Sequence, residues 1–300
     1  MSFPPNCTIA TCDPSESFYG YRPNLGIDVF FAIVYTAVIS YSLYIVFRKK
    51  SWLGYTIALI IGSLLELIGY ASRIYGYADP FITDGWIAQY TSLTLAPVFM
   101  SASIYVCIGQ LADYLGRGRF NIRPRLYTRI FIPSDIFALV IQSSGGGISI
   151  TERSAQNGGV TTGQGIIIGG LSLQVISLTI FFVLFLGVIS PTDLFQSRRL
   201  RKLTGRDKRV RTFVILISVA ILLIIGRSIF RTIEFSQGVF GKLGHNEILF
   251  IILDGFPVAI ATSILALYHP VYCIPSTPRG ADSQELGTLA EDGRYRPVSA

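Results

Sequence analysis

Seven apolar segments divide the chain, and each is close to the roughly 20 residues that cross the hydrocarbon core of a bilayer. They lie at 25–47, 53–74, 87–110, 128–150, 164–189, 212–234 and 247–268. The fourth is the least apolar, because Asp135, Gln142 and three consecutive glycines interrupt it. This pattern predicts an all-α fold, a polytopic membrane protein built as a seven-transmembrane-helix bundle.

The composition supports a membrane protein and excludes an ordinary soluble domain. Hydrophobic residues make up 51% of the 300 residues, and charged residues only 14%, whereas soluble domains average about 25% charged residues. Most of the net charge of +7 lies in three short segments between apolar runs. Loops of this kind are typical of the cytosolic face of a membrane protein, so we expect no nucleic-acid partner.

The charges of the loops predict the orientation of the bundle. Three basic segments alternate along the chain with three acidic or near-neutral ones. The basic segments are Arg48–Lys50, Arg117–Arg125 and Arg198–Arg211, and the others are Tyr75–Trp86, Thr151–Gly163 and Phe235–Asn246. Basic loops stay in the cytosol, so we expect the N-terminus outside and the C-terminus inside. The basic loops are then placed to meet anionic lipid headgroups.

Three regions follow from this topology: an extracellular N-terminal segment (1–24), a transmembrane domain (25–270) and a polar, disordered cytosolic tail (271–300). The stretch Met1–Tyr21 lacks the basic and apolar parts of a secretory signal. Asn6-Cys7-Thr8 is a glycosylation sequon on the predicted outer side. Cys7 and Cys12 share that segment and either form a disulfide or remain free thiols.

Four of the predicted spans contribute the polar and ionisable side chains that we single out as candidates. Arg227, Arg231 and Glu234 are spaced by four and three residues, so they share one face of the sixth span. An arginine at the bilayer centre costs at least about 2.5–3.5 kcal/mol. We therefore expect this face to look inward. The other spans contribute Glu66 and Arg73, Asp135 and Gln142, and Asp254.

Three positive and three negative side chains fall in the predicted outer half: Glu66, Arg73, Arg227, Arg231, Glu234 and Asp254. Their equal numbers predict a paired network, since unpaired buried charges are strongly destabilising. The network either locks the helices in register or lines a polar cavity for the headgroup of an amphiphile. Asp135 lies nearer the middle; it is protonated, paired with an arginine, or bonded to polar side chains, and is a candidate for proton coupling.

Proline and glycine predict local irregularities. Pro97 and Pro257 are expected to kink the third and seventh spans. Gly145-Gly146-Gly147 is expected either to form irregular backbone beside a cavity or to be a flexible exit from the membrane. Glycines at the start of the fifth span are expected to let another helix approach closely.

The sequence gives little support for catalysis. Its two histidines, His245 and His269, fall at opposite ends of the predicted bundle, so they do not form a metal site. The last span has no lysine, and no nucleophile–base pair or nucleotide-binding motif is present. We therefore predict no enzymatic activity, no cofactor and no metal. A seven-helix receptor fits the topology, although Asp-Arg-Tyr and Asn-Pro-x-x-Tyr motifs are missing.

Short motifs occur in a fixed order along the predicted spans. They are Tyr21-x-Pro23, Glu66-x-x-Gly69-Tyr70-x-x-Arg73, Leu95-Ala96-Pro97, Ala102-x-Ile104-Tyr105, Asp135, Gln142-x-x-Gly145-Gly146-Gly147, Arg227-x-x-x-Arg231-x-x-Glu234-Phe235-x-x-Gly238 and Asp254-x-x-Pro257. In this order and spacing they resemble the fungal Rta-like proteins, also called the lipid-translocating exporter family. The resemblance covers nearly all of the spanning region.

The resemblance implies a fungal protein of the plasma membrane or another cell membrane that moves amphiphilic lipids. Implied substrates are sphingoid long-chain bases and phospholipid- or sterol-like compounds, whose efflux implies stress or drug resistance. Alternatives are a porphyrin or haem transporter and a sensor of lipids or toxic amphiphiles. The candidate substrate-binding residues are Glu66, Arg73, Asp135, Gln142, Arg227, Arg231, Glu234 and Asp254.

Overall fold

The computed structural model describes residues 12–13, 17, 19–49, 52–115, 124–152, 162–189, 205–237, 243–244 and 246–274. Its elements are α1 (Leu25–Lys49), α2 (Leu53–Ala78), α3 (Thr83–Leu115), α4 (Pro124–Glu152), α5 (Thr162–Ile189), α7 (Gly205–Ser236), α8 (Glu247–Phe250), the π-helical η4 (Ile251–Gly255), α9 (Phe256–Leu267) and α10 (Pro270–Cys273). No strand occurs among these residues. The predicted all-α fold is confirmed, and each predicted span coincides with one helix or with the run α8–η4–α9.

Six of these runs are long and apolar enough to cross a membrane: α1, α2, α3, α5, α7 and the run from Glu247 to Leu267. The helix α4 is as long as the others, at 29 residues. It is less apolar because Asp135, Gln142 and its glycines interrupt the hydrophobic run. The chain is therefore an integral, multi-pass membrane protein.

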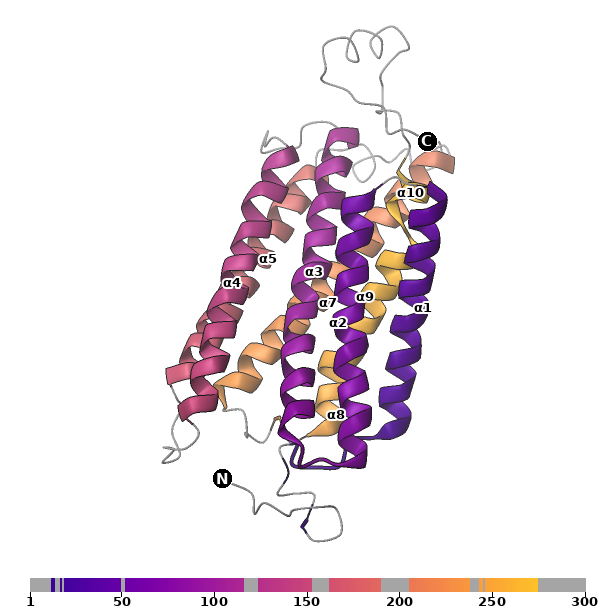
Figure 1. Cartoon of the computed structure of the whole chain (residues 1–300). Coiled ribbons are helices and arrows are strands. Elements are labelled where there is room, and N and C mark those ends of the chain that lie inside the picture. Colours follow the sequence, from indigo (N-terminus) through magenta and orange to yellow (C-terminus); the bar gives the residue numbers. More distant parts are fainter. Residues whose placement is uncertain are drawn as a thin grey trace, which may run out of the picture.

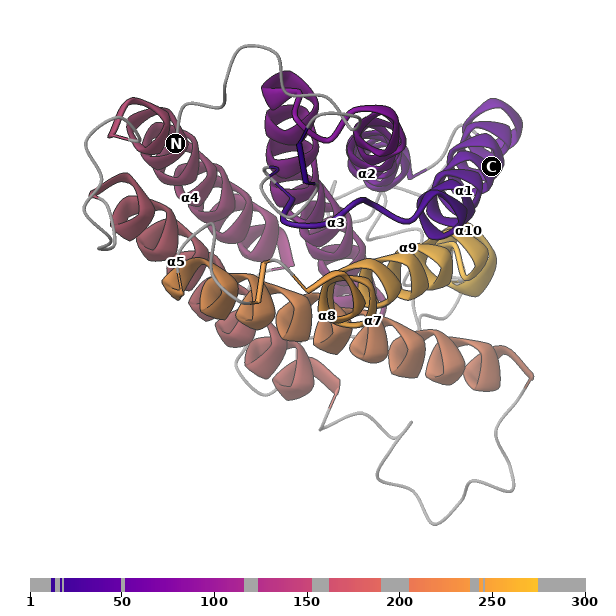
Figure 2. The same ribbon diagram turned by 90° about the horizontal axis from the view of Figure 1, so that it is seen from below.

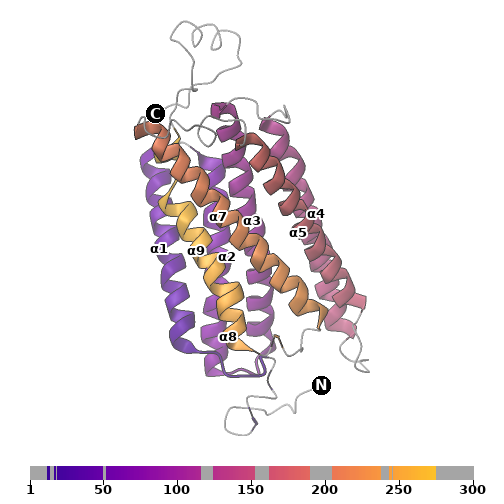
Figure 3. The same ribbon diagram turned by 180° about the vertical axis from the view of Figure 1, so that it is seen from behind.

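The helices pack in two layers. Seen along the bundle in Figure 2, α4, α3, α2 and α1 form one layer, and α5, α7 and the α8–α9 run form the other. The helix α7 crosses the bundle obliquely, from α10 at one end to α5 at the other (Figure 3). We call the end at which α1 and α8 begin and α2 and α7 end the N-terminal end; α10 lies at the opposite end (Figure 1).

The distribution of side chains is that of a protein surrounded by lipid. Large apolar side chains point outward: Ile33, Val140 and Ile248 are more than 60% exposed. Charged side chains point inward, and Arg73 and Glu66 are at most 1% exposed. Ionised groups are costly in hydrocarbon, so they are placed inside the bundle where protein groups surround them.

The last span is not a regular α-helix. A π-helical segment, η4, contains Asp254 and joins α8 to α9 just before Pro257. The ring of a proline clashes with the carbonyl four residues earlier, and one wider turn relieves this clash. The structural irregularity predicted at Pro257 is therefore a π-helical turn, and it presents Asp254 to the interior, where it is 1% exposed. Pro97 lies within the continuous helix α3.

The glycines of α4 and α5 bring these two helices into close contact. A Cβ atom at Gly170 would lie 2.9 Å from the Ala138 carbonyl oxygen, and one at Gly145 would lie 2.7 Å from the Gly163 carbonyl oxygen. The prediction of irregular or flexible backbone at Gly145-Gly146-Gly147 is wrong, because α4 continues as a helix to Glu152. Helix packing compensates for the low helix propensity of glycine there.

Candidate functional site

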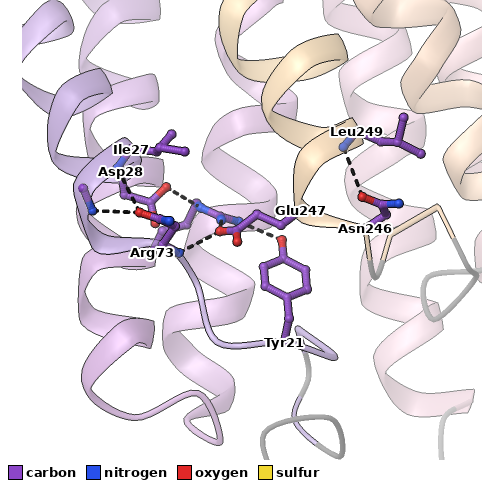
Figure 4. A network of polar contacts seen from close by, with 9 residues as sticks. Tyr21, Ile27, Asp28, Arg73, Asn246, Glu247 and Leu249 are labelled. Carbon is purple, nitrogen blue, oxygen red and sulfur yellow. Dashed lines mark hydrogen bonds and ion pairs between the residues drawn. The ribbon is translucent and has the colours of Figure 1, made fainter.

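Arg73 of α2 is the centre of an ion-pair cluster at the N-terminal end of the bundle (Figure 4). Its guanidinium contacts Asp28 of α1 at 2.7 Å and Glu247 of α8 at 3.0 Å. It also donates a hydrogen bond to the Tyr21 hydroxyl, at 3.3 Å. Burial raises the pKa of Tyr21, so this hydroxyl remains protonated. The cluster ties the segment before α1 to three helices.

The acidic partners of Arg73 do not stand out in the sequence. Asp28 and Glu247 each lie in the first turn of a helix. Acids are common in first turns because the helix dipole favours negative charge there. A signal was nevertheless present, because a buried arginine in the second span requires acids at the same depth in neighbouring spans.

A second cluster joins α7 to the last span deeper in the bundle. Arg227 contacts Asp254 at 2.9 Å, and Arg231 contacts Glu234 at 2.7 Å and Asp254 at 3.6 Å. These ion pairs confirm that the charges of the predicted sixth and seventh spans meet inside the bundle. Their role in binding a substrate stays a prediction.

The helix α3 completes the surroundings of the two α7 arginines. Arg227 donates to the Leu93 carbonyl, and Arg231 contacts the Thr94 hydroxyl at 3.4 Å. The Arg231 guanidinium also lies 5.0 Å from the centre of the Tyr90 ring, within range of a cation–π interaction. Contacts with α3, α7 and η4 thus fix the positions of the two guanidinium groups.

Glu66 differs from the other acids predicted to join the network. It is 1% exposed, and among the described residues no arginine or lysine nitrogen lies within 4 Å of its carboxylate. Its electrostatic neighbours include Arg227, Asp254 and Tyr35. The predicted set of three balanced pairs is therefore wrong at Glu66, because Arg73 turns to acids at the helix ends instead.

Asp135 lies apart from both clusters, between α3, α4 and α5. Its Oδ2 accepts hydrogen bonds from the Ser101 and Tyr105 hydroxyls, each at 2.9 Å. Of the alternatives open for this side chain, pairing with an arginine is wrong and bonding to polar side chains is confirmed. Two turns along α4, Gln142 donates to the Gln174 Oε1 of α5 at 3.2 Å.

Acids outnumber basic residues in the buried interior. Among the described residues, the buried acids and arginines are Asp28, Glu66, Asp135, Glu234, Asp254, Arg73, Arg227 and Arg231. Each arginine has an acid of its own, which leaves Glu66 and Asp135 without a basic partner. Buried carboxylates in this situation require a proton or a bound cation.

The opposite end of the bundle is held together by uncharged groups. Val271 donates its backbone N–H to His269 Nδ1 at 3.3 Å, so Nε2 carries the proton and donates to the Thr56 hydroxyl at 2.9 Å. The Tyr55 hydroxyl donates to the Leu265 carbonyl. Burial lowers the pKa of His269 to about 4, so the imidazole is neutral at physiological pH.

Some candidate residues lie outside the described part of the chain. These are the sequon residue Asn6, the cysteine Cys7 and the histidine His245. Cys12 is disulfide-bonded, whereas Cys107 and Cys273 are free thiols. Pairing of Cys12 with Cys7, and glycosylation at Asn6, stay predictions.

Comparison with known proteins identifies the family. The model of the family described as "RTA1 like protein" matches residues 59–277. The sphingoid long-chain base transporter RSB1 of Saccharomyces cerevisiae is 30% identical over 313 residues, covering 91% of this chain and 80% of that protein. Protein RTA1 of the same yeast is 28% identical over 282 residues, covering 84% of each chain.

A third relative has a different named cargo. Protoporphyrin uptake protein 1 of Saccharomyces cerevisiae is 30% identical over 218 residues, which cover 70% of this chain and 68% of that protein. No solved structure matches this chain. The family model covers more than half of the sequence, and the match to RSB1 covers 91% of it. This chain therefore belongs to the RTA1-like protein family.

Proposed function

We propose that the protein is a transporter that moves amphiphilic lipids, of the sphingoid long-chain base type, between the two sides of a membrane. A relative that covers 91% of the chain is named as a transporter of this class. We further propose that the protein moves its cargo without chemical conversion and without a cofactor. Movement rather than catalysis fits an interior that offers charges and hydroxyl groups inside a lipid-facing apolar shell.

The observation that carries this proposal is the acidic surplus of the buried interior. Glu66 and Asp135 are at most 2% exposed and lack a basic partner among the described residues. Ionisable groups within spanning helices mark substrate or ion pathways by default, because each is costly to bury. A cationic headgroup supplies the charge that the interior lacks, while its apolar chain remains among apolar helix surfaces and lipid.

A headgroup site also needs polar contacts that a bound headgroup can replace, and the ion-paired arginines provide them. Arg231 contacts both Glu234 and Asp254, at 2.7 Å and 3.6 Å. A hydroxyl group of the headgroup can replace the longer contact, between Arg231 and Asp254, because Asp254 keeps Arg227 and Arg231 keeps Glu234. We propose that this cluster, together with Glu66, receives the polar end of the cargo.

Flux in proteoliposomes tests the proposal. A fluorescent sphingoid base is added to one leaflet, and its movement to the other is followed with and without the full chain. We expect protein-dependent movement, which Glu66→Gln reduces about tenfold because the variant removes an uncompensated charge. Asp84→Asn is the matched control, since Asp84 is an exposed acid in the first turn of α3. Movement at the same rate in protein-free vesicles would refute transport of this class.

Porphyrin transport is the second candidate, because one relative is named for protoporphyrin uptake. Protoporphyrin carries two carboxylates, so it suits the arginines better than an interior with surplus acids. The same vesicles distinguish the two cargoes: a porphyrin transporter would move protoporphyrin and not the base. A sensor would bind the base without moving it.

We propose that the protein resides in the plasma membrane with its N-terminal end outside. The loop charges support this orientation, since the segments around Arg48–Lys50, Arg117–Arg125 and Arg198–Arg211 are basic. On this proposal they contact anionic headgroups of the cytosolic leaflet, each basic residue contributing about 1 kcal/mol. Most of these segments lie outside the described residues.

A further inference from the structure

The hydrogen bonds of Asp135 leave half of its carboxylate without a partner. Ser101 and Tyr105 of α3 both donate to Oδ2, whereas Oδ1 has no hydrogen-bond partner among the described residues. From α5, Ser177 lies against the same carboxylate, and its hydroxyl oxygen likewise has no well-formed hydrogen bond. Asp135 is 2% exposed, so bulk water does not supply the missing partner.

No basic group of the described bundle is available to Asp135. Arg73 is paired with Asp28 at the N-terminal end, and the two arginines of α7 are paired with acids of α7 and η4. A buried carboxylate without a counter-charge is strongly unfavourable unless a proton or another cation joins it. The Asp135 carboxylate therefore lacks the counter-charge that would balance it in the described part of the folded bundle.

Aromatic rings lie one turn from the carboxylate. Phe131 precedes Asp135 by four residues on α4, and Phe181 follows Ser177 by four residues on α5, so each shares a face with its polar neighbour. The Tyr105 ring lies 4.4 Å from Phe181 and 5.5 Å from Phe131, centre to centre. The faces of aromatic rings attract ammonium groups that lie within about 6 Å of the ring centre.

A further acceptor without a described partner lies two turns beyond Asp135 on α4. Gln142 lies seven residues further along α4, and its Oε1 has no partner among the described residues. Its Nε2 donates to Gln174, which fixes the orientation of the amide. This oxygen is therefore a second buried acceptor without a described partner at the contact between α4 and α5, about 10 Å along α4 from Asp135.

We infer that Asp135, with Ser101, Tyr105, Ser177 and the rings of Phe131 and Phe181, is a site for the protonated amine of a long-chain base. This inference rests on the proposed function, because it assigns the headgroup of the proposed cargo to a second site apart from the arginine clusters. The ammonium donates to the free Oδ1, and its charge balances the carboxylate. A neutral amide of the same chain keeps one N–H donor but lacks the positive charge that balances the carboxylate.

Direct binding tests the site without requiring transport. The full chain in detergent is titrated with sphingosine and with N-acetylsphingosine, which differ in the charge of the nitrogen. Asp135→Asn keeps the shape of the side chain and its contacts with Ser101 and Tyr105 but removes the charge. We expect it to weaken sphingosine binding at least tenfold and to leave N-acetylsphingosine binding unchanged. Asp84→Asn should alter neither affinity.

A second variant keeps the site testable if Asp135→Asn does not fold. Phe131→Leu keeps the carboxylate and removes one ring, and it should weaken sphingosine binding roughly two- to fivefold while sparing the amide. Equal loss of both ligands in both variants, or no loss in either, would overturn the site. So would stabilisation of the wild-type protein by sodium ions alone to the same extent as by sphingosine.

Binding and flux together separate this inference from the proposed function. Charge-dependent binding that Asp135→Asn abolishes, in a protein that moves no lipid, would retain the amine site and reject transport. Flux of sphingosine with unchanged rate and affinity in Asp135→Asn would reject the amine site and retain transport.

Discussion

Arg231 illustrates how one side chain holds several elements together in a dry interior. Its guanidinium binds Glu234 on its own helix and Asp254 in the π-helical segment, and it faces the Tyr90 ring of α3. At 2% exposure it has no access to bulk water. The charge of Arg231 is therefore stabilised by neighbouring protein groups, and its removal leaves Glu234 without an ion-pair partner in an apolar interior.

Replacing Arg231 by methionine should destabilise the folded protein by about 3–5 kcal/mol, because Glu234 loses its partner. Thermal unfolding in detergent micelles measures the effect. The double variant Arg231→Met with Glu234→Met should recover part of the loss, since it leaves no unpaired charge from that pair. Arg22→Met is the control, because Arg22 is exposed and stacks on Tyr77 at the surface. An Arg231 variant as stable as this control would contradict the burial argument.

At the residue scale, sequence reasoning recovers which side chains are buried but only part of their pairing. Helical spacing correctly places Arg227 and Arg231 on the inward face of α7, and depth alone brings Asp254 beside them. The partner of Arg73 depends on how α1 and α8 begin, which no spacing within α2 reveals. The predicted pairing of Glu66 fails for the same reason, because Arg73 pairs with Asp28 and Glu247 instead.

At the scale of elements, α4 and α5 pack through glycine faces. Gly170 is buried and faces Ala138 and Gln142, whereas the adjacent Gly169 points to open space. Two neighbouring glycines on one helix thus have opposite surroundings. Close approach of the two backbones places Asp135 and Gln142 of α4 against α5, so the packing of α4 on α5 also shapes the proposed amine site.

The two glycines should respond to alanine with opposite sign. A Cβ at Gly170 would lie 2.7 Å from the Gln142 Cγ, so Gly170→Ala should destabilise the protein by about 1–3 kcal/mol through overpacking. Gly169→Ala has free space and should stabilise α5 by up to about 1 kcal/mol through helix propensity. Thermal unfolding of both variants in one detergent measures the difference. Equal shifts of the same sign would show that α4 and α5 do not pack as described.

The elements themselves are the most predictable feature of this chain. Apolar runs of about 20 residues have few alternatives to helix in a bilayer, since backbone groups must be satisfied internally. The predicted spans therefore match the helices, including α4 despite Asp135 and its glycines. The helical state of Gly145–Gly147 was not predictable from propensity, because it depends on contact with Gly163 and Ile167 of α5.

At the scale of the whole molecule, the two ends of the bundle use different chemistry. The N-terminal end contains the Arg73 cluster, with Asp28 and Glu247, whereas neutral contacts of His269 and Tyr55 fasten the opposite end. The α7 cluster lies toward the N-terminal end as well, since Arg231 is five residues from the end of α7. The orientation of the protein in the membrane therefore decides in which leaflet the two arginine clusters lie.

Cysteine labelling in spheroplasts tests the proposed orientation, in a Cys273→Ser background that removes the partly exposed free thiol. Asp84→Cys places a thiol at the N-terminal end, and Lys49→Cys places one at the opposite end; both positions are exposed. If basic loops remain in the cytosol, a membrane-impermeant maleimide should label Asp84→Cys in intact spheroplasts and Lys49→Cys only after permeabilisation. The parent protein gives the background, because Cys107 is buried and Cys12 is disulfide-bonded. The reverse pattern would place the arginine clusters toward the cytosol, and cargo would then meet the charged half of the interior from the inner leaflet.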